Sequence, residues 1–238
     1  MSNKVWTTTS NFENNYRYMD LSFPGRVDYP ELARLQELKA QDKLTDDEEK
    51  KRKEKVNSLI EIEKIYFSGR KLDPEIIPNI LYAHNIAKNV KLPAFFRVNS
   101  GIIISESCAE ILKKFRLGET GLYPLSFFDI QLNESVNDQT YYFLNIAELR
   151  SYLRPEDCIK KMRKQTYTQH QGYQLFNLYD GFYADNAIAI AKEAVECDVD
   201  LWRDPELKSS IFISDALKDA LDAEQLSQDW QFFLCKLV

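Results

Sequence analysis

Three carboxylates in the last quarter of the chain have the spacing that a metal site needs. Asp198 and Asp200 alternate around Val199, and Asp204 follows them. Alternate side chains of a β-strand lie on one face, so Asp198 and Asp200 would offer two oxygens to Mg²⁺, which prefers carboxylate ligands. The alternative is an exposed polar segment leading into a turn at Asp204-Pro205. We favour this alternative because no phosphate-binding motif accompanies the carboxylates.

The histidines and cysteines form no recognisable metal-binding pattern. The sequence has two histidines, His84 and His170, and four cysteines, Cys108, Cys158, Cys197 and Cys235. It contains no CxxC pair, and neither histidine lies near a cysteine in the sequence, whereas zinc sites take ligands in close pairs. We therefore expect four reduced and mostly buried thiols, no metal held by protein side chains and no cofactor.

Common catalytic signatures are also missing. The sequence contains no GxGxxG, P-loop, GxSxG or HExxH motif. His84 falls in a predicted helix, where a packed or surface histidine is the usual case. His170 falls in a polar loop without a nearby nucleophile. The chain is therefore predicted not to be an enzyme.

A segment of aromatic and acidic residues around Gly181 has the composition of a recognition loop. It contains Tyr179, Asp180, Tyr183 and Asp185. Tyrosine provides a rigid amphipathic contact surface, and aspartate can pair with a basic partner. We predict that these four residues bind a partner protein. The alternative is a hairpin turn whose tyrosines pack on its own flanks.

The charge balance is acidic, with 37 Asp and Glu against 31 Lys and Arg and a formal charge of −6. A protein that binds phosphate backbones has an excess of Lys and Arg, so we expect no nucleic-acid partner. An acidic face suits a basic partner protein, although the same charge also promotes solubility alone. The sequence has no apolar leader segment and no apolar run of membrane-spanning length, so we expect a cytoplasmic protein without a membrane partner.

Two segments share a strand–serine–helix pattern and align without a gap. In residues 101–118 three isoleucines precede Ser105, and in residues 210–227 Ile-Phe-Ile precedes Ser214. Three apolar residues predict a short buried strand, the serine can cap a helix, and the acid that follows each serine lies in the favourable first turn. The pattern predicts an internal repeat in which each helix leads to an aromatic strand.

The N-terminal part differs from the rest. Residues 4–30 are rich in aromatic and turn-forming residues and predict short strands and loops. Residues 31–65 predict a helical hairpin with a charged outer face, whose second helix has Thr45 as its cap and a run of acids in its first turn. We expect residues 1–73 to form an aromatic segment and helical hairpin, and residues 74–238 to form an α+β domain.

After this hairpin the sequence predicts both strands and short helices. Aromatic and β-branched residues predict strands at 140–146 and 172–179. We expect short helices around residues 79–87 and over residues 185–194, the second capped by Asp185. The predicted fold class is α+β, with a mixed or antiparallel sheet, flanking helices, two similar strand–serine–helix units and an N-terminal helical hairpin.

The order of short motifs over residues 74–238 resembles the bacterial polymorphic-toxin immunity proteins of family eleven, formerly a domain of unknown function. The motifs are, in chain order, Pro78-Asn79-Ile80, Ile103-Ile104-Ser105, Tyr141–Ile146, Asp200–Arg203 and Ile211–Asp215. The chain departs from that family at Leu226–Asp229, where a glycine is usual, and in the charged hairpin at 31–65. The resemblance implies a cytosolic protein that binds and neutralises one cognate toxin, and it implies no catalytic residues.

Two other functions are open on the sequence alone. A metal-dependent hydrolase would use Asp198, Asp200 and Asp204. A regulatory adaptor would use the charged helical hairpin against another helix. We favour the immunity protein, whose partner-binding surface is expected outside the matched motifs, because these are mainly core strands and helix caps.

Overall fold

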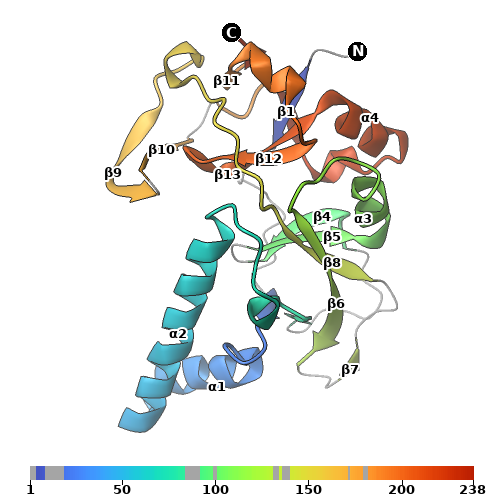
Figure 1. The fold of residues 1–238 in the computed structure, drawn as a ribbon. Coiled ribbons are helices and arrows are strands. Elements are labelled where there is room, and N and C mark those ends of the chain that lie inside the picture. Colours follow the sequence, from blue (N-terminus) through green and yellow to red (C-terminus); the bar gives the residue numbers. More distant parts are fainter. Residues whose placement is uncertain are drawn as a thin grey trace.

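The computed structural model shows an α+β fold in which two β-sheets lie one above the other (Figure 1). It describes residues 4–8, 19–83, 92–98, 101–130, 134–135, 140–170, 172–178 and 182–238. Its α-helices in this part are α1 (Tyr29–Ala40), α2 (Asp46–Tyr66), α3 (Glu106–Leu112) and α4 (Asp215–Ala223). The predicted α+β class with mostly antiparallel or mixed sheets is confirmed.

The larger sheet, here called the large sheet, has the strand order β2-β3-β6-β8-β5-β4, and β7 pairs with β6. Its strands are β2 (Met19–Ser22), β3 (Ile80–Ala83), β4 (Phe95–Val98), β5 (Gly101–Ser105), β6 (Gly121–Asp129), β7 (Glu134–Ser135) and β8 (Tyr141–Asn145). Neighbouring strands are antiparallel except for the parallel pair of β3 and β6. The strand predicted at 140–146 corresponds to β8.

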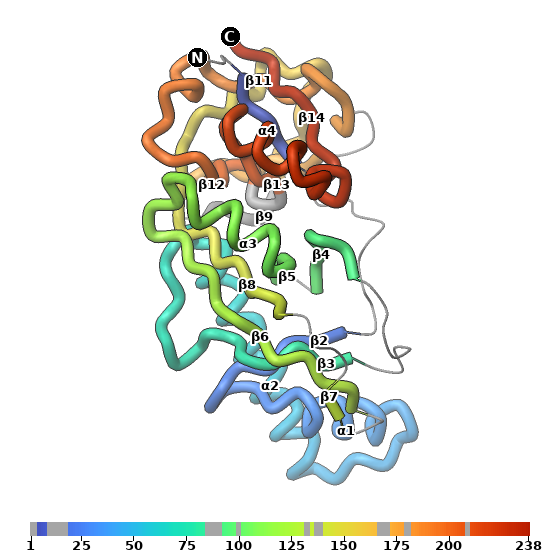
Figure 2. Tube along the Cα trace, turned by 90° about the vertical axis from the view of Figure 1, so that its right-hand side faces the viewer, coloured from blue at the N-terminus to red at the C-terminus, as the bar shows by residue number. Residues whose placement is uncertain are grey.

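The second sheet, here called the C-terminal sheet, has the order β12-β13-β1-β14 and is antiparallel throughout. Its strands are β1 (Val5–Thr8), β12 (Leu201–Asp204), β13 (Leu207–Ser214) and β14 (Phe232–Leu234). Two small sheets complete the fold: β9 (Arg163–His170) with β10 (Tyr173–Asn177), and β11 (Ala189–Ile190) with β15 (Lys236–Leu237). Strand β1 and the C-terminal strands lie together at one end of the molecule (Figure 2).

A serine ends one strand of each sheet and begins a helix. The Ser105 hydroxyl at the end of β5 accepts a hydrogen bond from the Cys108 amide (3.3 Å), and α3 follows. At the end of β13 the Ser214 hydroxyl accepts one from the Leu217 amide (3.3 Å), and α4 follows. In both cases the hydroxyl satisfies an amide that has no partner within its helix.

Helices α1 and α2 lie side by side at the end of the molecule opposite to the C-terminus (Figure 1). Thr45 and Glu48 form a reciprocal capping box that starts α2. Ion pairs join the helices between Arg34 and Glu48 (3.1 Å) and between Lys55 and Glu31 (2.6 Å). The predicted domain boundary at residue 73 stays a prediction. Strands from before and after this residue pair in both sheets: β1 with β13 in the C-terminal sheet, and β2 with β3 in the large sheet.

Two helix predictions are wrong. Residues 80–83 of the helix expected around 79–87 form β3, which pairs with β2 and β6, and residues 84–91, including His84, lie outside the described part. Residues 185–194 contain the strand β11 and the start of the 3₁₀-helix Lys192–Glu196 instead of an α-helix. Pairing with β15 decides the second case, because strand partners distant in sequence override local propensity. His170 ends β9 and does not lie in a loop.

The core leucines of the two serine-capped helices provide a stability test. Leu112 of α3 and Leu221 of α4 are fully buried. We expect Leu112→Ala and Leu221→Ala each to lower the free energy of unfolding by roughly 2–5 kcal/mol, because each leaves a cavity. Chemical denaturation measures this change. The control Ile60→Ala, at a side chain that is 44% exposed, should cost well under half as much, and equal losses would contradict the core assignment.

Candidate functional site

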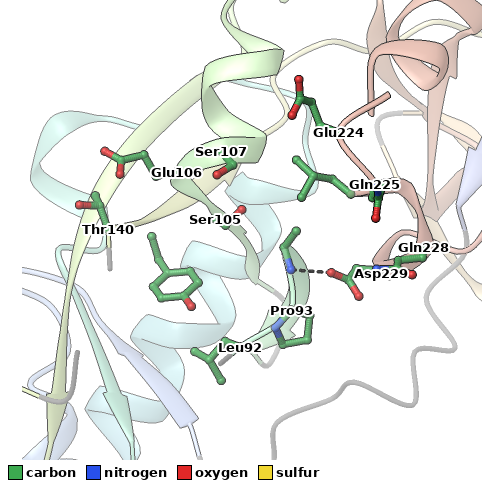
Figure 3. Close-up of a pocket in the computed structure, with 13 residues that line it drawn as sticks. Leu92, Pro93, Ser105, Glu106, Ser107, Thr140, Glu224, Gln225, Gln228 and Asp229 are labelled. Atoms are coloured by element: carbon green, nitrogen blue, oxygen red, sulfur yellow. Dashed lines mark hydrogen bonds between the residues drawn. The ribbon is translucent and has the colours of Figure 1, made fainter. Parts of the chain in front are cut away.

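A polar pocket of about 710 Å³ lies between the start of α3 and the segment that follows α4 (Figure 3). Its lining includes Leu92, Pro93 and Ala94, which come directly before β4 in the sequence. The other lining residues are Ser105, Glu106, Ser107, Thr140, Tyr141, Glu224, Gln225, Leu226, Gln228 and Asp229. Segments more than 100 residues apart in sequence therefore meet in one depression of the surface.

Local chain geometry positions both walls of this pocket. On one wall Ser105 caps α3, so Glu106 is held at the first residue of the helix. On the other wall α4 ends at Ala223, and Gln225 has a positive φ of 59°, which turns the chain into the 3₁₀-helix Ser227–Asp229. Asp229 then accepts a hydrogen bond from the Ala94 amide (2.6 Å), which ties the second wall to the large sheet.

The pocket is acidic. Glu106, Glu224 and Asp229 line it, and no Lys, Arg or His is among the described lining residues. Glu106 and Glu224 are exposed, whereas Asp229 is half-buried and uses one oxygen on the Ala94 amide. Hydroxyl and amide groups complete the lining, so the pocket suits the cationic or hydrogen-bond-donating side chains of a partner.

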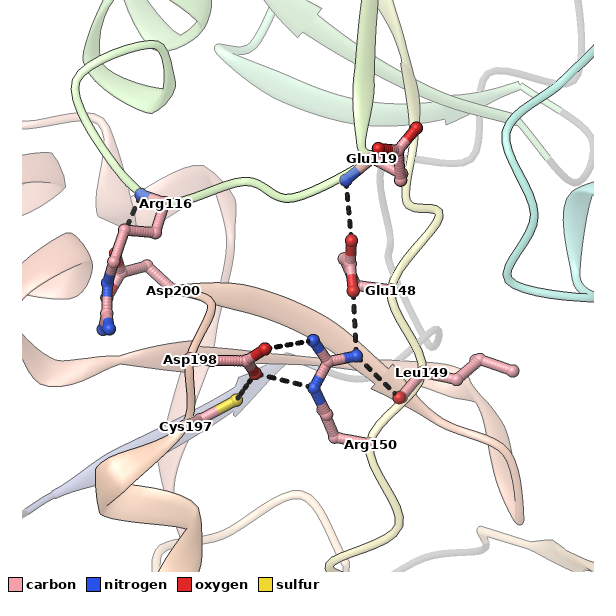
Figure 4. Close-up of polar contacts among 8 residues, drawn as sticks. All are labelled: Arg116, Glu119, Glu148, Leu149, Arg150, Cys197, Asp198 and Asp200. Carbon is pink, nitrogen blue, oxygen red and sulfur yellow. Dashed lines mark hydrogen bonds and ion pairs between the residues drawn. The ribbon is translucent and has the colours of Figure 1, made fainter.

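The three carboxylates suspected of binding metal are used separately within the structure (Figure 4). Asp198 makes a two-pronged ion pair with Arg150 (2.8 and 2.9 Å). Asp200 accepts hydrogen bonds from the Arg116 guanidinium (3.0 and 3.1 Å) and from the Arg116 amide (2.9 Å). Each aspartate thus has its own arginine partner, although both lie in one short segment.

Asp204 is buried and binds backbone amides. One carboxylate oxygen accepts from the amides of Tyr152 and Leu153, both at 2.9 Å, and the other accepts from Glu206 (2.9 Å). Burial raises the pKa of Asp204, although these three hydrogen bonds act in the opposite direction. Within the described ranges no group of three or more His, Cys, Asp or Glu side chains is arranged to hold a metal ion.

Glu148 extends this polar network towards the large sheet (Figure 4). It accepts a hydrogen bond from the Glu119 amide (2.6 Å) and forms an ion pair with Arg150 (2.8 Å). Gly118 must be a glycine here, since its φ is +57° and an added Cβ would lie 1.9 Å from Glu148 Oε1. Sequence reasoning missed this network, because its arginine partners lie 48 and 84 residues from their aspartates.

The structure describes only part of the predicted recognition loop. Tyr179 and Asp180 lie outside the described residues. Tyr183 is half-buried, with its ring centroid 6.5 Å from that of Phe233. Asp185 is exposed and accepts a hydrogen bond from the Leu234 amide (2.7 Å). The two described side chains therefore lie against β14, and their role towards a partner stays a prediction.

All four cysteines are free thiols, and three of them are buried. Burial raises the pKa of Cys108 to about 12 and also raises those of Cys158, Cys197 and Cys235. A raised pKa keeps the thiol protonated at neutral pH, and the protonated thiol is a poor nucleophile. None of the four has the environment of a catalytic cysteine.

Comparison with known proteins gives no family for this chain. No protein-family model matches it, and no curated protein matches its sequence significantly. None of the helices in the described part of the chain combines the length and the apolar character that a membrane crossing requires.

The Asp200–Arg116 pair predicts a dependence of stability on pH. Burial of Asp200 alone would raise its pKa, but hydrogen bonds from Arg116 and Ser214, together with the charge of Arg116, outweigh burial, and the pKa is lowered. A carboxyl whose pKa is lower in the folded state stabilises the fold above its unfolded pKa of about 3.9, and this contribution is lost as the pH falls towards the folded value. Denaturation curves of the parent and Asp200→Asn should therefore converge below about pH 4.

The control for this experiment is Asp219→Asn, at an exposed position of α4. Its difference in unfolding free energy from the parent should change little over the same pH range. If the parent and Asp200→Asn keep a constant difference from about pH 6 to pH 3, the ion pair does not contribute in the way described.

Proposed function

We propose that this protein is a binding protein that neutralises a cognate bacterial toxin, and that the acidic pocket receives a basic segment of that toxin. The observation that supports this proposal most is the pocket itself, which has two exposed carboxylates, Glu106 and Glu224, and no basic side chain among the lining residues that the structure describes. The net charge of −6 would attract a basic toxin over a distance and speed association.

The partners of the three candidate metal-binding aspartates favour a binding protein over a metal-dependent hydrolase. Asp198, Asp200 and Asp204 have the spacing of a metal site, but their oxygens are taken up by arginines and backbone amides. In the pocket, by contrast, the side-chain carboxylates of Glu106 and Glu224 form no hydrogen bond or ion pair with another described residue, although the Glu106 backbone amide donates to the Thr140 carbonyl (3.1 Å). Free carboxylates are therefore available at the pocket and not at the candidate metal site.

We further infer that the two strand–serine–helix units belong to two copies of one module, and that the pocket lies where these copies meet. Strand order supports this inference: β4-β5-β8-β6 in the large sheet corresponds to β12-β13-β1-β14 in the C-terminal sheet. Every neighbouring pair in both series is antiparallel. In each series the helix follows the second strand and leads to the fourth.

Strand registers support the same inference. Phe96 of β4 pairs with Ile103 of β5, and Trp202 of β12 pairs with Phe212 of β13. The gap-free sequence alignment that matches Ser105 with Ser214 also matches Ile103 with Phe212. The first strand of each module thus pairs with the second strand at equivalent positions.

The third strand of each module also occupies an equivalent position. Ser105 pairs with Tyr141 at the start of β8, and Ser214 pairs with Val5 at the start of β1. In the first module this strand comes after the helix in the sequence, whereas in the second it comes from the N-terminus of the chain. On this inference, two copies of one module share a common sheet order but differ in connectivity.

The loop residues Tyr179, Asp180, Tyr183 and Asp185 are proposed as a second contact with the toxin. Tyr183 and Asp185 lie against β14, the strand that follows the Asp229 wall of the pocket. Aromatic and acidic side chains on loops are the kind of anchors that dominate protein interfaces. The pocket is the primary proposed site, because the carboxylates of Glu106 and Glu224 have no partner among the described residues.

The test of this function starts from the genes next to the one that encodes this protein, among which the proposal expects a gene for a secreted toxin. Co-production of the two proteins should protect cells from the toxin, and isothermal titration should show a direct complex. Protection without a complex would contradict neutralisation by binding. A complex without protection would show that the interaction does not inhibit the toxin.

Charge removal from the pocket tests where the toxin binds. We expect Glu106→Gln/Glu224→Gln to weaken toxin binding about tenfold or more, or about 1.4 kcal/mol, mainly through slower association at low salt. The control Asp219→Asn/Glu193→Gln removes the same charge at exposed positions outside the pocket and should leave affinity nearly unchanged. Unchanged affinity in the pocket variant, together with loss in Tyr183→Ala/Asp185→Ala, would move the site to the loop.

A further inference from the structure

A second pocket, here called the apolar pocket, lies where the α1–α2 hairpin meets the large sheet. Its volume is about 370 Å³. Both helices line it, together with the strands β2, β4, β5 and β8, and it shares no described lining residue with the acidic pocket. Pockets of about 300 to 1,000 Å³ hold small molecules in proteins, so this one is large enough for a compact ligand.

The inner lining of the apolar pocket is hydrophobic and rich in aromatic rings. Leu32 of α1, Ile62 of α2 and Val98 of β4 are buried side chains of this lining. Four buried aromatic residues accompany them, namely Phe23, Tyr29, Tyr66 and Phe143. An apolar ligand gains by leaving water for such a surface, and the rings of the pocket can stack on an aromatic one.

Contacts among the lining residues fix the walls of this pocket. The Tyr66 hydroxyl donates to the Leu144 carbonyl (2.9 Å), and the ring centroid of Tyr66 lies 5.3 Å from that of Phe143. Leu21 and Phe143 lie directly on the backbone of Gly101, because a Cβ added there would be 2.7 Å from Leu21 Cδ1 and 3.2 Å from Phe143 Cε2. The pocket is thus a preformed space bordered by closely packed groups.

The polar part of the lining is acidic. It consists of Gln36 and Glu63, which are exposed, and Asp20, which is half-buried. Burial, followed by a hydrogen bond to Asp20, raises the pKa of Tyr29, so the Tyr29 hydroxyl stays protonated and donates to this carboxylate. The lining residues that the structure describes include no Lys, Arg or His. A cationic ligand would therefore be attracted to this pocket, and an anionic one would be repelled.

We propose that the apolar pocket binds a small hydrophobic amine. The apolar part of the ligand fills the space among the aromatic rings, and its ammonium group pairs with the carboxylates of Asp20 and Glu63. The faces of the rings add to the attraction for a cation. Amphiphiles of the same size that carry a carboxylate bind more weakly. The site does not depend on the proposed toxin binding, since the two pockets have separate linings.

The test is titration of the full chain with phenylbutylamine, phenylbutanol and phenylbutyrate, followed by NMR of its methyl groups. These probes have similar apolar parts and differ in the charge of the terminal group. The amine should bind with a Kd of about 1 mM or lower, as expected for a small ligand in an apolar pocket. It should bind about tenfold more tightly than the carboxylate, with the alcohol in between. The methyl groups of Leu32, Ile62 and Val98 should show the largest shifts.

Glu63→Gln removes one of the two charges at an exposed position of α2. It should reduce the preference for the amine over the carboxylate about threefold, as expected for a solvent-exposed ion pair, and leave the affinity for the alcohol unchanged. The control Glu54→Gln removes the same charge from an exposed position of the same helix outside the lining, and it should keep the full preference.

Several results would overturn the proposal. One is the absence of saturable amine binding up to about 10 mM, and another is a set of shifts confined to methyl groups outside the apolar pocket. Equal affinity for the three probes, or a preference for the carboxylate, would show that the pocket does not select amines. A full preference for the amine in Glu63→Gln would contradict the role of this carboxylate.

Discussion

The position of β1 is the constraint on which the rest of the structure depends. Strand β1 lies between β13 and β14, so the first described residues of the chain form an inner strand of the C-terminal sheet. Its side chains reinforce the pairing: Thr7 donates to the Ile211 carbonyl (3.1 Å), Thr8 binds the Trp230 carbonyl, and the Trp6 indole binds Asp215 at the start of α4 (2.5 Å). The C-terminal sheet cannot be complete without the N-terminus, so both parts of the chain must fold together.

The position of β1 also determines how the two sheets contact each other. Once β1 fixes the C-terminal sheet, β12 places Arg203 against Tyr66 at the end of α2, and Asp200 meets Arg116 in the loop after α3. The backbone of β12 also bonds to the segment that follows β8. Buried charges and ion pairs hold this junction, whereas apolar side chains fill the core within each sheet and its helices. Shape is thus set by packing, and the relative placement of the sheets by polar contacts.

The sequence predicts those features of the fold that depend on neighbouring residues, and it fails where the deciding contact comes from a distant part of the chain. The helix starts at Ser105, Thr45 and Ser214 follow a local capping rule, and the aromatic run of β8 favours a strand by composition alone. The local sequence predicts a helix where β3 lies, because the partners β2 and β6, which decide its structure, lie far from it in the sequence. The acidic pocket has no sequence signature, since its walls come from segments on either side of a long intervening stretch.

The central claim is that the acidic pocket between the two serine-capped helices binds a basic toxin. Hydrogen–deuterium exchange of the protein, alone and with its proposed toxin partner, tests this claim most directly. The account predicts slower exchange of the backbone amides at residues 105–107 and 224–229, with little change in α1 and α2. Protection confined to the α1–α2 hairpin, with none around the pocket, would contradict it.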